Sequence, residues 1–182
     1  DCRNRRMRKV VTNSGGLNGT TCYYYAGWRV TEEHDGSDAI TQQYVYGGRY
    51  IDEVWTLDKR AGGISVADLN DSSGSDRLFY HQNLLYHVYA LTDEAGAIKE
   101  AIKNFDAYGK VTSFLTGAGT DTNWFTGDDV TAAGTAVANP FTYTGQRLDR
   151  ETGLMYYKRR YMSVYLGRFL SRDPVGFTRR VL

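Results

Sequence analysis

Proline, cysteine and long apolar runs are scarce in this sequence of 182 residues. Two cysteines, Cys2 and Cys22, allow at most one disulfide, which excludes a scaffold held together by several disulfides. No apolar run approaches about 18 residues, so no transmembrane helix is expected. The charges almost cancel, 22 Lys and Arg against 21 Asp and Glu, which argues against a dedicated nucleic-acid binder and a polybasic membrane-surface protein.

Tyrosine and glycine are what the sequence has in excess. There are 15 Tyr and 20 Gly but only two Pro. Tyrosine favours half-buried pleated surfaces, and glycine adopts the positive φ angles that tight turns require. Many short strands joined by tight turns need this composition, so the sequence predicts an all-β fold.

Charge is unevenly distributed along the chain. Residues 1–10 carry a net charge of +4 and residues 145–182 carry +6, so the segment between them carries −9 to give the total of +1. Two interpretations stay open. The basic ends contact the acidic middle or a partner, or these charges lie on strand faces that point to solvent.

Four segments share one layout, in which aromatic residues precede a turn with glycine and a basic or apolar strand follows. Alternating aromatic side chains point to opposite faces of a strand, and glycine suits the turn between two strands. A basic residue after the turn lays its stem over aromatic rings. Each segment is therefore predicted to be a β-hairpin, and neighbouring hairpins to pair into one sheet. The segments are residues 23–30, 44–51, 104–111 and 141–148.

Polar joints lie between the predicted strands. Residues 35–38 and 70–76 predict loops, because Asp, Asn, Ser and Gly favour turns. Residues 93–103 have the composition of a helix, but Gly96 interrupts it. A strand over 98–102, after an Asp-Glu-Ala-Gly turn, is the favoured interpretation.

One of the hairpin units resembles a known sequence repeat. Phe105, Asp106, Gly109 and Lys110 match the aromatic-Asp-x-x-Gly-Arg/Lys pattern of the tyrosine-aspartate (YD) repeat of the Rhs family. Members of that family wind strips of such hairpins into a spiralling sheet that closes as a hollow β-shell. The resemblance implies an all-β fold of successive antiparallel YD-type hairpins that form part of a curved, spiralling sheet.

The C-terminal third resembles the Rhs repeat-associated core, which in the family seals one end of the shell. The core signature ends in an Arg-Phe-x-x-x-Asp-Pro-x-Gly element, and residues 168–176 match it. The residues of this chain that carry the resemblance are Gly145, Gln146, Arg147, Asp149, Thr152, Gly153, Tyr156, Tyr157, Arg160, Tyr161, Gly167, Arg168, Phe169, Pro174 and Gly176.

The resemblance implies a structural, non-enzymatic role. In polymorphic toxins of this family the shell holds a variable C-terminal effector, so the expected function is to encapsulate or present a toxin module in a secreted or cell-surface bacterial protein. The expected partners are the remainder of its own parent chain, upstream YD repeats and a downstream effector, without nucleic acid or membrane insertion. The expected organisation is hairpins over 1–115, a loop-like insertion over 116–139, the core over 140–177 and a tail over 178–182.

Two alternative functions stay open. Exposed aromatic rings such as Trp28, Trp55 and Trp124 are suited to stacking on sugars, which favours a cell-surface module that binds glycans. In the family an aspartate-dependent self-cleavage frees the effector, and Asp173 with Arg172 match the first element of that site. An aspartyl mechanism needs a second carboxylate close to the first, and these residues contain no second Asp-Pro-x-Gly element.

No cofactor and no metal are expected. His81 and His87 lie among tyrosines on a predicted strand pair, and no third ligand is spaced to complete a metal site. Residues 68–76 and 121–129 resemble calcium loops, but neither has the complete ligand pattern with its closing bidentate Glu.

Overall fold

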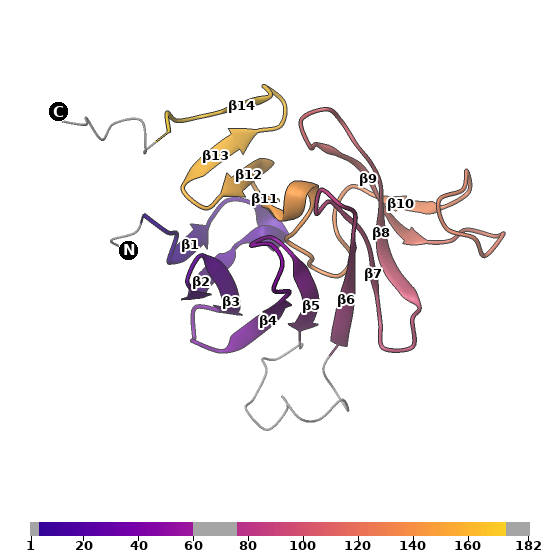
Figure 1. Cartoon of the computed structure of the whole chain (residues 1–182), viewed down its shortest axis with the longest axis horizontal. Helices are drawn as coiled ribbons and strands as arrows, with labels where there is room; N and C mark the ends of the chain where they lie inside the picture. The colour runs from indigo at the N-terminus through magenta and orange to yellow at the C-terminus, as the bar shows by residue number, and fades with distance from the viewer. Residues whose placement is uncertain (1–3, 60–75, 174–182) are drawn as a thin grey trace.

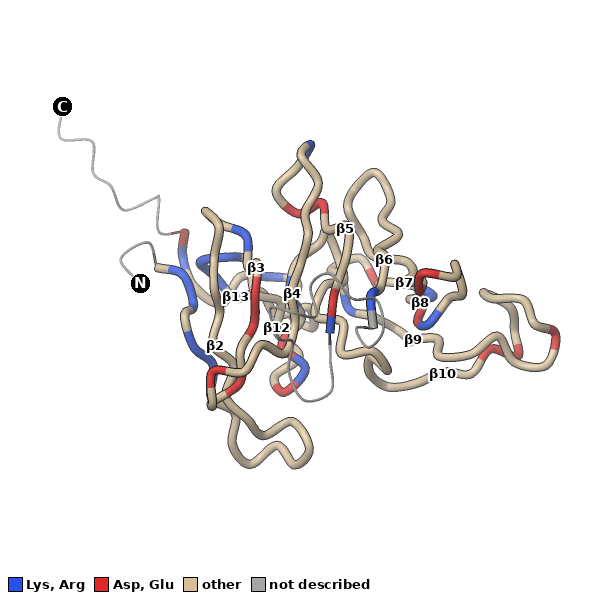
Figure 2. Tube along the Cα trace, turned by 90° about the horizontal axis from the view of Figure 1, so that it is seen from below, with Lys and Arg blue, Asp and Glu red and all other residues tan. Residues whose placement is uncertain are grey.

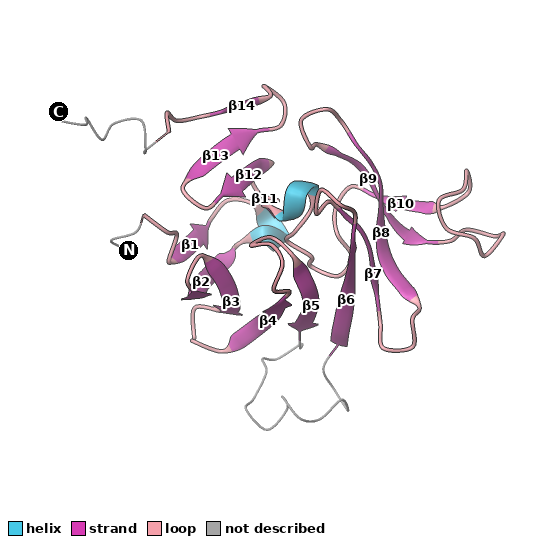
Figure 3. Cartoon of the chain, viewed as in Figure 1, coloured by secondary structure: helices cyan, strands magenta, loops and turns pink. Residues whose placement is uncertain are grey.

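The computed structural model describes residues 4–59 and 76–173. Over these residues the chain forms two antiparallel sheets, and in each sheet every strand pairs with the next strand along the chain (Figure 1). This meander follows from hairpin connections, because short turns join antiparallel neighbours. The all-β prediction is confirmed, since the described residues are strands and loops apart from single-turn 3-10 helices (Figure 3).

The larger sheet has ten strands in the order β1 to β10. One 3-10 helix, η1 (Gly15–Leu17), lies between its first two strands. Within the described residues its outer strands, β1 and β10, each pair on one side only. The bounds are β1 (Arg8–Val11), β2 (Gly19–Ala26), β3 (Arg29–His34), β4 (Ile40–Tyr46), β5 (Val54–Lys59), β6 (Asp76–Gln82), β7 (Val88–Thr92), β8 (Ile98–Phe105), β9 (Val111–Gly117) and β10 (Val130–Ala132).

The smaller sheet is formed by the C-terminal part of the chain. A second 3-10 helix, η3 (Tyr143–Gly145), leads into it and lies inside the curve of the larger sheet (Figure 1). The backbone N–H of Arg6 donates a hydrogen bond of 3.0 Å to the Tyr156 hydroxyl, which ties the N-terminal segment to this sheet. The four strands are β11 (Arg147–Asp149), β12 (Leu154–Tyr157), β13 (Arg160–Ser163) and β14 (Arg168–Phe169).

Four turns of the larger sheet share one hydrogen-bond pattern. In each, an Asp or Asn side-chain oxygen accepts the backbone N–H groups of the second and fourth residues after it, over 2.8–3.0 Å. The third residue after it has a positive φ between 62° and 89°. This side chain satisfies two backbone donors that the turn leaves unpaired. The turns begin at Asp35, Asn83, Asp93 and Asp106.

Two of the predicted hairpins, residues 23–30 and 104–111, form as expected. Gly27 turns between β2 and β3 at a φ of 64°, and Gly109 turns between β8 and β9 at 89°. The strand predicted over residues 98–102 is also confirmed, because β8 begins at Ile98.

Two other hairpin predictions need correction. After β4 ends at Tyr46, β5 begins only at Val54, so residues 49–51 are not the return strand. The Glu53 carboxylate accepts the Arg49 N–H over 2.9 Å and holds this loop closed. Residues 141–148 do not add a hairpin to the larger sheet, because η3 and β11 occupy this segment and a single bridge joins Phe141 to Arg147.

The predicted loop-like insertion over residues 116–139 contains strand. β9 runs to Gly117, and β10 pairs with β9 in antiparallel register. The loop between them folds back, so that Trp124 packs against a small cluster of Ala90, Ala101 and Leu115. Covering apolar surface gives this otherwise polar loop a fixed position.

The main hydrophobic core lies between the larger sheet and the segment that follows β10. Phe141 is its central ring, 4% exposed, with its centroid 5.2 Å from that of Tyr44 and 5.9 Å from that of Tyr80. Both contacts are edge-to-face, an arrangement that aromatic pairs favour. The strand residues of this core are Tyr23, Val30, Tyr44, Val54, Leu57, Leu78, Tyr80, Val88, Leu91, Ile102 and Phe114.

Candidate functional site

Residues 134–149, here called the crossing segment, lie across the larger sheet and contact strands far away in the sequence. The fully buried Glu100 carboxylate on β8 accepts the backbone N–H of Ala136 over 2.7 Å and the Asn139 amide over 3.4 Å. The Tyr80 hydroxyl on β6 donates to Asn139 over 2.9 Å. Burying a carboxylate is costly unless donors surround it, and the crossing segment supplies those donors.

A buried ion pair joins the crossing segment to β3. The Arg147 guanidinium donates to the Glu33 carboxylate, and both side chains are about nine-tenths buried. The guanidinium also lies over the rings of Tyr23 and Phe141, 5.3 and 5.0 Å from their centroids. Two of its nitrogens, Nε and Nη1, have no hydrogen-bond partner among the described residues, so cation–π contacts are their main compensation.

Tyr44 completes this buried cluster. Its hydroxyl donates to the Glu33 carboxylate over 2.6 Å. Burial raises the pKa of Tyr44 well above its usual value, and the charge of Glu33 raises it further. The phenol therefore stays protonated and donates to Glu33 across the physiological pH range.

A second cluster of charges joins the smaller sheet to the N-terminal segment. The Asp149 carboxylate accepts from Arg6 over 2.5 Å and from Lys9 over 3.3 Å, and Lys9 also reaches Glu151. Figure 2 shows Lys and Arg concentrated near the N-terminus and β13, with Asp and Glu on β3. Of the two interpretations of the charge distribution, contact of a basic end with the acidic middle describes the Arg147–Glu33 pair, whereas Arg6 and Lys9 pair with carboxylates of the other basic end.

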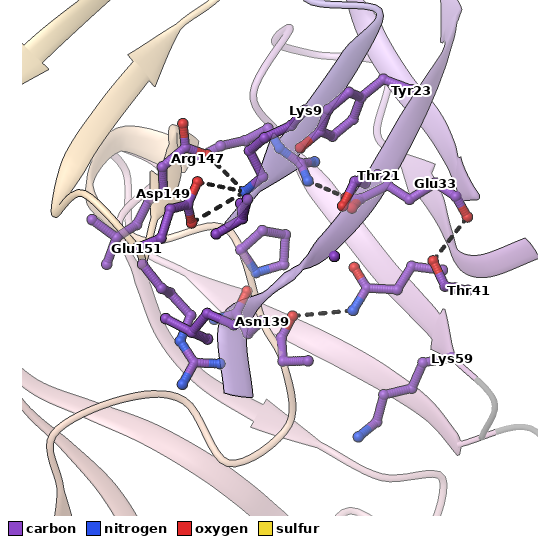
Figure 4. Close-up of a pocket in the computed structure, with 18 of the residues that line it drawn as sticks. Lys9, Thr21, Tyr23, Glu33, Thr41, Lys59, Asn139, Arg147, Asp149 and Glu151 are labelled. Atoms are coloured by element: carbon purple, nitrogen blue, oxygen red, sulfur yellow. Dashed lines mark hydrogen bonds and ion pairs between the residues drawn. The ribbon is translucent and has the colours of Figure 1, made fainter. Parts of the chain in front are cut away.

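An open cavity of about 530 Å³ lies between these two clusters. Its lining combines Lys9 and Tyr23 from β1 and β2 with Glu33, Arg147 and Glu151 (Figure 4). The charged groups in the lining are mostly paired with one another, as the dashed lines of Figure 4 show. Most of the charge in the described lining of this cavity is therefore already neutralised by a neighbouring residue.

The C-terminal part of the chain also contacts a row of turns at one end of the larger sheet. In a meander, every second turn lies at the same end, so the β2–β3, β4–β5, β6–β7 and β8–β9 turns form one row. At the first turn, the Arg159 guanidinium lies 4.7 Å from the centroid of Trp28. At the second, Lys158 pairs with Asp52 over 2.5 Å, and Gln146 donates to Asp52 over 2.8 Å.

The contacts continue along the other two turns of the row. At the third turn, the Thr144 N–H donates to His87 Nδ1 over 2.9 Å, and Tyr143 stacks on the His87 ring at 4.3 Å. At the fourth, Tyr143 lies against Gly109. We call the residues that make these contacts the C-terminal clasp; they are Tyr143, Thr144, Gly145, Gln146, Lys158, Arg159, Tyr165 and Gly167.

Several residues of the predicted core motif therefore meet at the junction between the two sheets. Gln146, Arg147 and Asp149 make its polar contacts. Gly145, Gly153 and Gly167 have positive φ angles of 61–68°, which explains glycine there. Tyr156 and Tyr161 pack on each other, and Tyr157 packs on Phe169. The Thr152 hydroxyl bonds to Asp149, Arg168 is exposed, and Pro174 and Gly176 lie outside the described residues.

The residues predicted for self-cleavage lie at the end of the described chain. Both Asp173 and Arg172 are exposed, and the Asp173 carboxylate pairs with Arg160 over 3.2 Å. Arg160 also lies over the Phe169 ring at 3.8 Å, which fixes its position. Self-cleavage through Asp173 stays a prediction.

The three tryptophans lie in different environments. Trp28 is covered by Arg159, Trp124 packs on the outer face of the sheet, and Trp55 is 55% exposed. They do not form one stacking platform, so nothing in the described residues favours glycan binding at these rings.

The described residues contain no group of three or more His, Cys, Asp or Glu side chains that could hold a metal ion. His87 belongs to the clasp contacts, and His81 bonds to Thr92. Cys22 is a free thiol, whereas Cys2 and residues 68–75, most of the segment that resembles a calcium loop, fall outside the described ranges. Among residues 4–59 and 76–173 no helix is long and apolar enough to cross a membrane.

Sequence patterns had not singled out Glu33, Glu100 or Asp52. Each is a carboxylate on the larger sheet whose partner lies between 36 and 114 residues away in the sequence. Glu100 alone carries a local signal, because it is a charged residue between the apolar residues Ile98 and Ala101 of a strand. For the others, only the fold brings the partners together.

Comparison with known structures identifies the fold. The chain resembles the large toxin assemblies TcdB2-TccC3, at a TM-score of 0.62 and 21% identity over 94% of this chain, and the Photorhabdus luminescens Tc holotoxin pore, at a TM-score of 0.58 and 19% identity over 97%. Each match covers 7% of the larger chain. The chain therefore has the antiparallel β-fold found in a part of these toxin proteins.

The curated relatives are a nuclease and a deaminase toxin, both much longer than this chain. The chain is 27% identical over 176 residues, 96% of its length, to the tRNA3(Ser)-specific nuclease WapA of Bacillus spizizenii. It is 30% identical over 117 residues, 64% of its length, to the double-stranded DNA deaminase toxin A of Burkholderia cenocepacia. It spans 6% and 7% of the length of these two relatives. No family model matches the chain.

Proposed function

We propose that this chain is a structural segment of an Rhs-type, YD-repeat toxin protein that helps to enclose or present a C-terminal effector. Its own residues contribute walls and contacts and perform no chemistry on a substrate. The protein is expected to be secreted or displayed at a cell surface, and its partners are the remainder of its own chain and the effector.

One observation carries the proposal. The crossing segment fastens a curved hairpin sheet through the buried Glu33–Arg147 pair, and the C-terminal clasp contacts the four turns in one row at one end of that sheet. Such fastening suits a wall that has to keep its curvature, because the twist between neighbouring strands varies over a range of angles and contacts that span several turns fix it. The likeness to parts of much larger toxins supports the same conclusion.

Protease protection of the effector tests this function. In the polypeptide that carries this chain, a downstream effector enclosed by the wall is expected to resist proteinase K. Replacing Arg147 with Leu removes the partner of Glu33 and is expected to expose the effector to digestion. Fragments would be identified by mass spectrometry.

The exposed Arg168 on β14 provides the matched control. Arg168→Leu removes the same charge without breaking the buried pair, so protection should persist. If the effector in the unmodified protein is digested as fast as in the Arg147→Leu variant, enclosure by this wall is contradicted. A parent polypeptide with no domain besides hairpin repeats contradicts the function as a whole.

A further inference from the structure

The four turns that share one hydrogen-bond pattern differ at their tips. The two tip residues are Gly36 and Ser37 in the turn that begins at Asp35. They are Glu94 and Ala95 in the Asp93 turn, and Ala107 and Tyr108 in the Asp106 turn. The turn that begins at Asn83 has two leucines at its tip, Leu84 and Leu85, which are 98% and 64% exposed. The turn itself uses only backbone N–H groups at these places, so the fold does not require Leu84 and Leu85.

A hollow of about 630 Å³ adjoins these leucines. Tyr50 and Tyr86 stack at 4.6 Å on one side of it, and Tyr143 and Tyr157 of the C-terminal part also line it. Its charged residues are already paired, because Asp52 binds Lys158 and also accepts from Gln146. The surface left for a ligand is apolar and aromatic, and its size falls within the range of about 300–1,000 Å³ typical of binding pockets.

The position of the hollow indicates what fills it. The clasp covers Trp28 on the β2–β3 turn and contacts Tyr108 on the β8–β9 turn. The leucine tip of the β6–β7 turn projects beyond the clasp. The hollow is thus continuous with an interface that polypeptide from the same chain already forms. The patch is far smaller than the roughly 20–30 residues a side of a stable interface between separate proteins. A tethered segment, in contrast, acts at an effective concentration of about millimolar and needs no more area than this.

We propose that Leu84 and Leu85 anchor an apolar segment of the same parent polypeptide, from outside residues 1–182, which seats in this hollow. The inference rests on the proposed function, because it requires a longer parent chain. The occupant carries aliphatic or aromatic side chains and no charge at the contact, since the hollow has no unpaired charge to receive one.

Photo-crosslinking in the parent protein tests the anchor. A photo-reactive amino acid replaces Leu85 in one sample and Ala95 in the other, because Ala95 holds the same position in the Asp93 turn. We expect the Leu85 position to crosslink to one peptide outside residues 1–182 of the same polypeptide, and this crosslink to be absent at Ala95. Equal labelling at both positions, or a crosslink to a separate protein or a second copy, overturns the proposal.

A second measurement separates docking from folding. Leu84→Ser with Leu85→Ser should leave the melting temperature of the 182-residue chain unchanged, because Ser37 occupies the same place in the Asp35 turn. In the parent protein, deuterium uptake of the crosslinked peptide should rise, and Glu94→Ser with Ala95→Ser should not raise it; unchanged uptake overturns the proposal. Intact-mass analysis distinguishes the two ideas: a protein no longer than 182 residues contradicts the proposed function, whereas a longer one without the crosslink contradicts only the anchor.

Discussion

The two sheets are held by different kinds of contact. In the larger sheet, four turns are each closed by a side chain two to four residues away, as Asp106 closes the β8–β9 turn. The smaller sheet and the crossing segment are held by contacts of long sequence separation, such as Arg147 with Glu33, 114 residues apart. The larger sheet is therefore specified hairpin by hairpin, whereas the C-terminal part depends on a surface that exists only after the hairpins have formed.

The two kinds of contact also differ in how much stability is lost when one partner is removed. A surface turn loses one or two hydrogen bonds when its Asp or Asn is removed, and water replaces them at small cost. A buried charge that loses its partner cannot be rehydrated in place. We therefore expect substitutions at the junction between the two sheets to lower the unfolding free energy more than substitutions in the turns.

Arg147→Leu is expected to give the largest effect. It leaves Glu33 buried with only the Tyr44 hydroxyl as a strong donor, which costs about 3–5 kcal/mol of unfolding free energy. Urea denaturation followed by tyrosine and tryptophan fluorescence measures this loss. The double variant Glu33→Leu with Arg147→Leu should recover a large part of the stability, and a double variant as unstable as the single one would show that packing, not charge, dominates here.

The next comparison uses two glycines that hold the same position in two turns of the same kind, Gly96 in the Asp93 turn and Gly109 in the Asp106 turn. Gly96 has open space around it, so Gly96→Ala costs only the strain of a positive φ, about 1–2 kcal/mol. At Gly109 an added Cβ would lie 2.5 Å from the Tyr143 ring of the clasp, so Gly109→Ala is expected to cost about 1–3 kcal/mol more. Thermal unfolding of both variants measures the difference, and equal losses would mean that the clasp does not press on this turn.

Removing a turn side chain should have a smaller effect. Asp106→Ala deletes the acceptor of two backbone N–H groups and is expected to cost about 1 kcal/mol, because these groups are exposed and water can bind them. Asp106→Asn should retain most of the stability, since Asn83 closes an equivalent turn. A loss as large as that of Arg147→Leu would contradict the local character of these turns.

The smallest expected effects are those of pH, and they have opposite signs in the two regions. Burial lowers the pKa of His34 on β3, but hydrogen bonds to Asp38 and Glu32 outweigh burial, so the folded pKa is raised above 6.5. Its stabilisation is complete below pH 6.5 and is lost as the pH rises through the folded pKa. Burial lowers the pKa of His87 at the clasp below 6.5, so the stabilisation that depends on neutral His87 is lost as the pH falls below 6.5. NMR titration of both rings measures the two pKa values, and the opposite order would contradict this account.

The sequence predicted the larger sheet better than the junction for the same physical reason. The turn around Asp106 and Gly109 can be predicted because all of its hydrogen bonds lie within residues 106–110, and the tyrosine-rich strands follow a local alternation. Three equivalent turns were missed as members of one pattern. An Asp or Asn placed five residues before the first residue of the return strand was the available signal, and the positive-φ residue need not be glycine, as Tyr86 and Asp38 show.

The junction could be predicted only as a list of residues. Resemblance to the core motif pointed to Gln146, Arg147 and Asp149, but not to what they contact, because Asp52 lies in a polar loop and Glu33 in a strand with other polar residues, and neither looks buried in the sequence. The segment 44–51 was mispredicted for a related reason. Its expected return strand is displaced to Val54 by a loop whose Asp52 is held by the clasp, a contact that no local pattern contains.

The row of clasped turns restricts how such a sheet can change length in evolution. Trp28, Asp52, His87 and Gly109 all lie at one end because an even number of strands separates each from the next. Inserting or deleting one strand would move every later turn to the opposite end, out of reach of the clasp. Inserting or deleting two would keep the phase. Gene-level gain and loss of strands between these turns is therefore restricted to whole hairpins, in the way that a reading frame restricts insertions to whole codons.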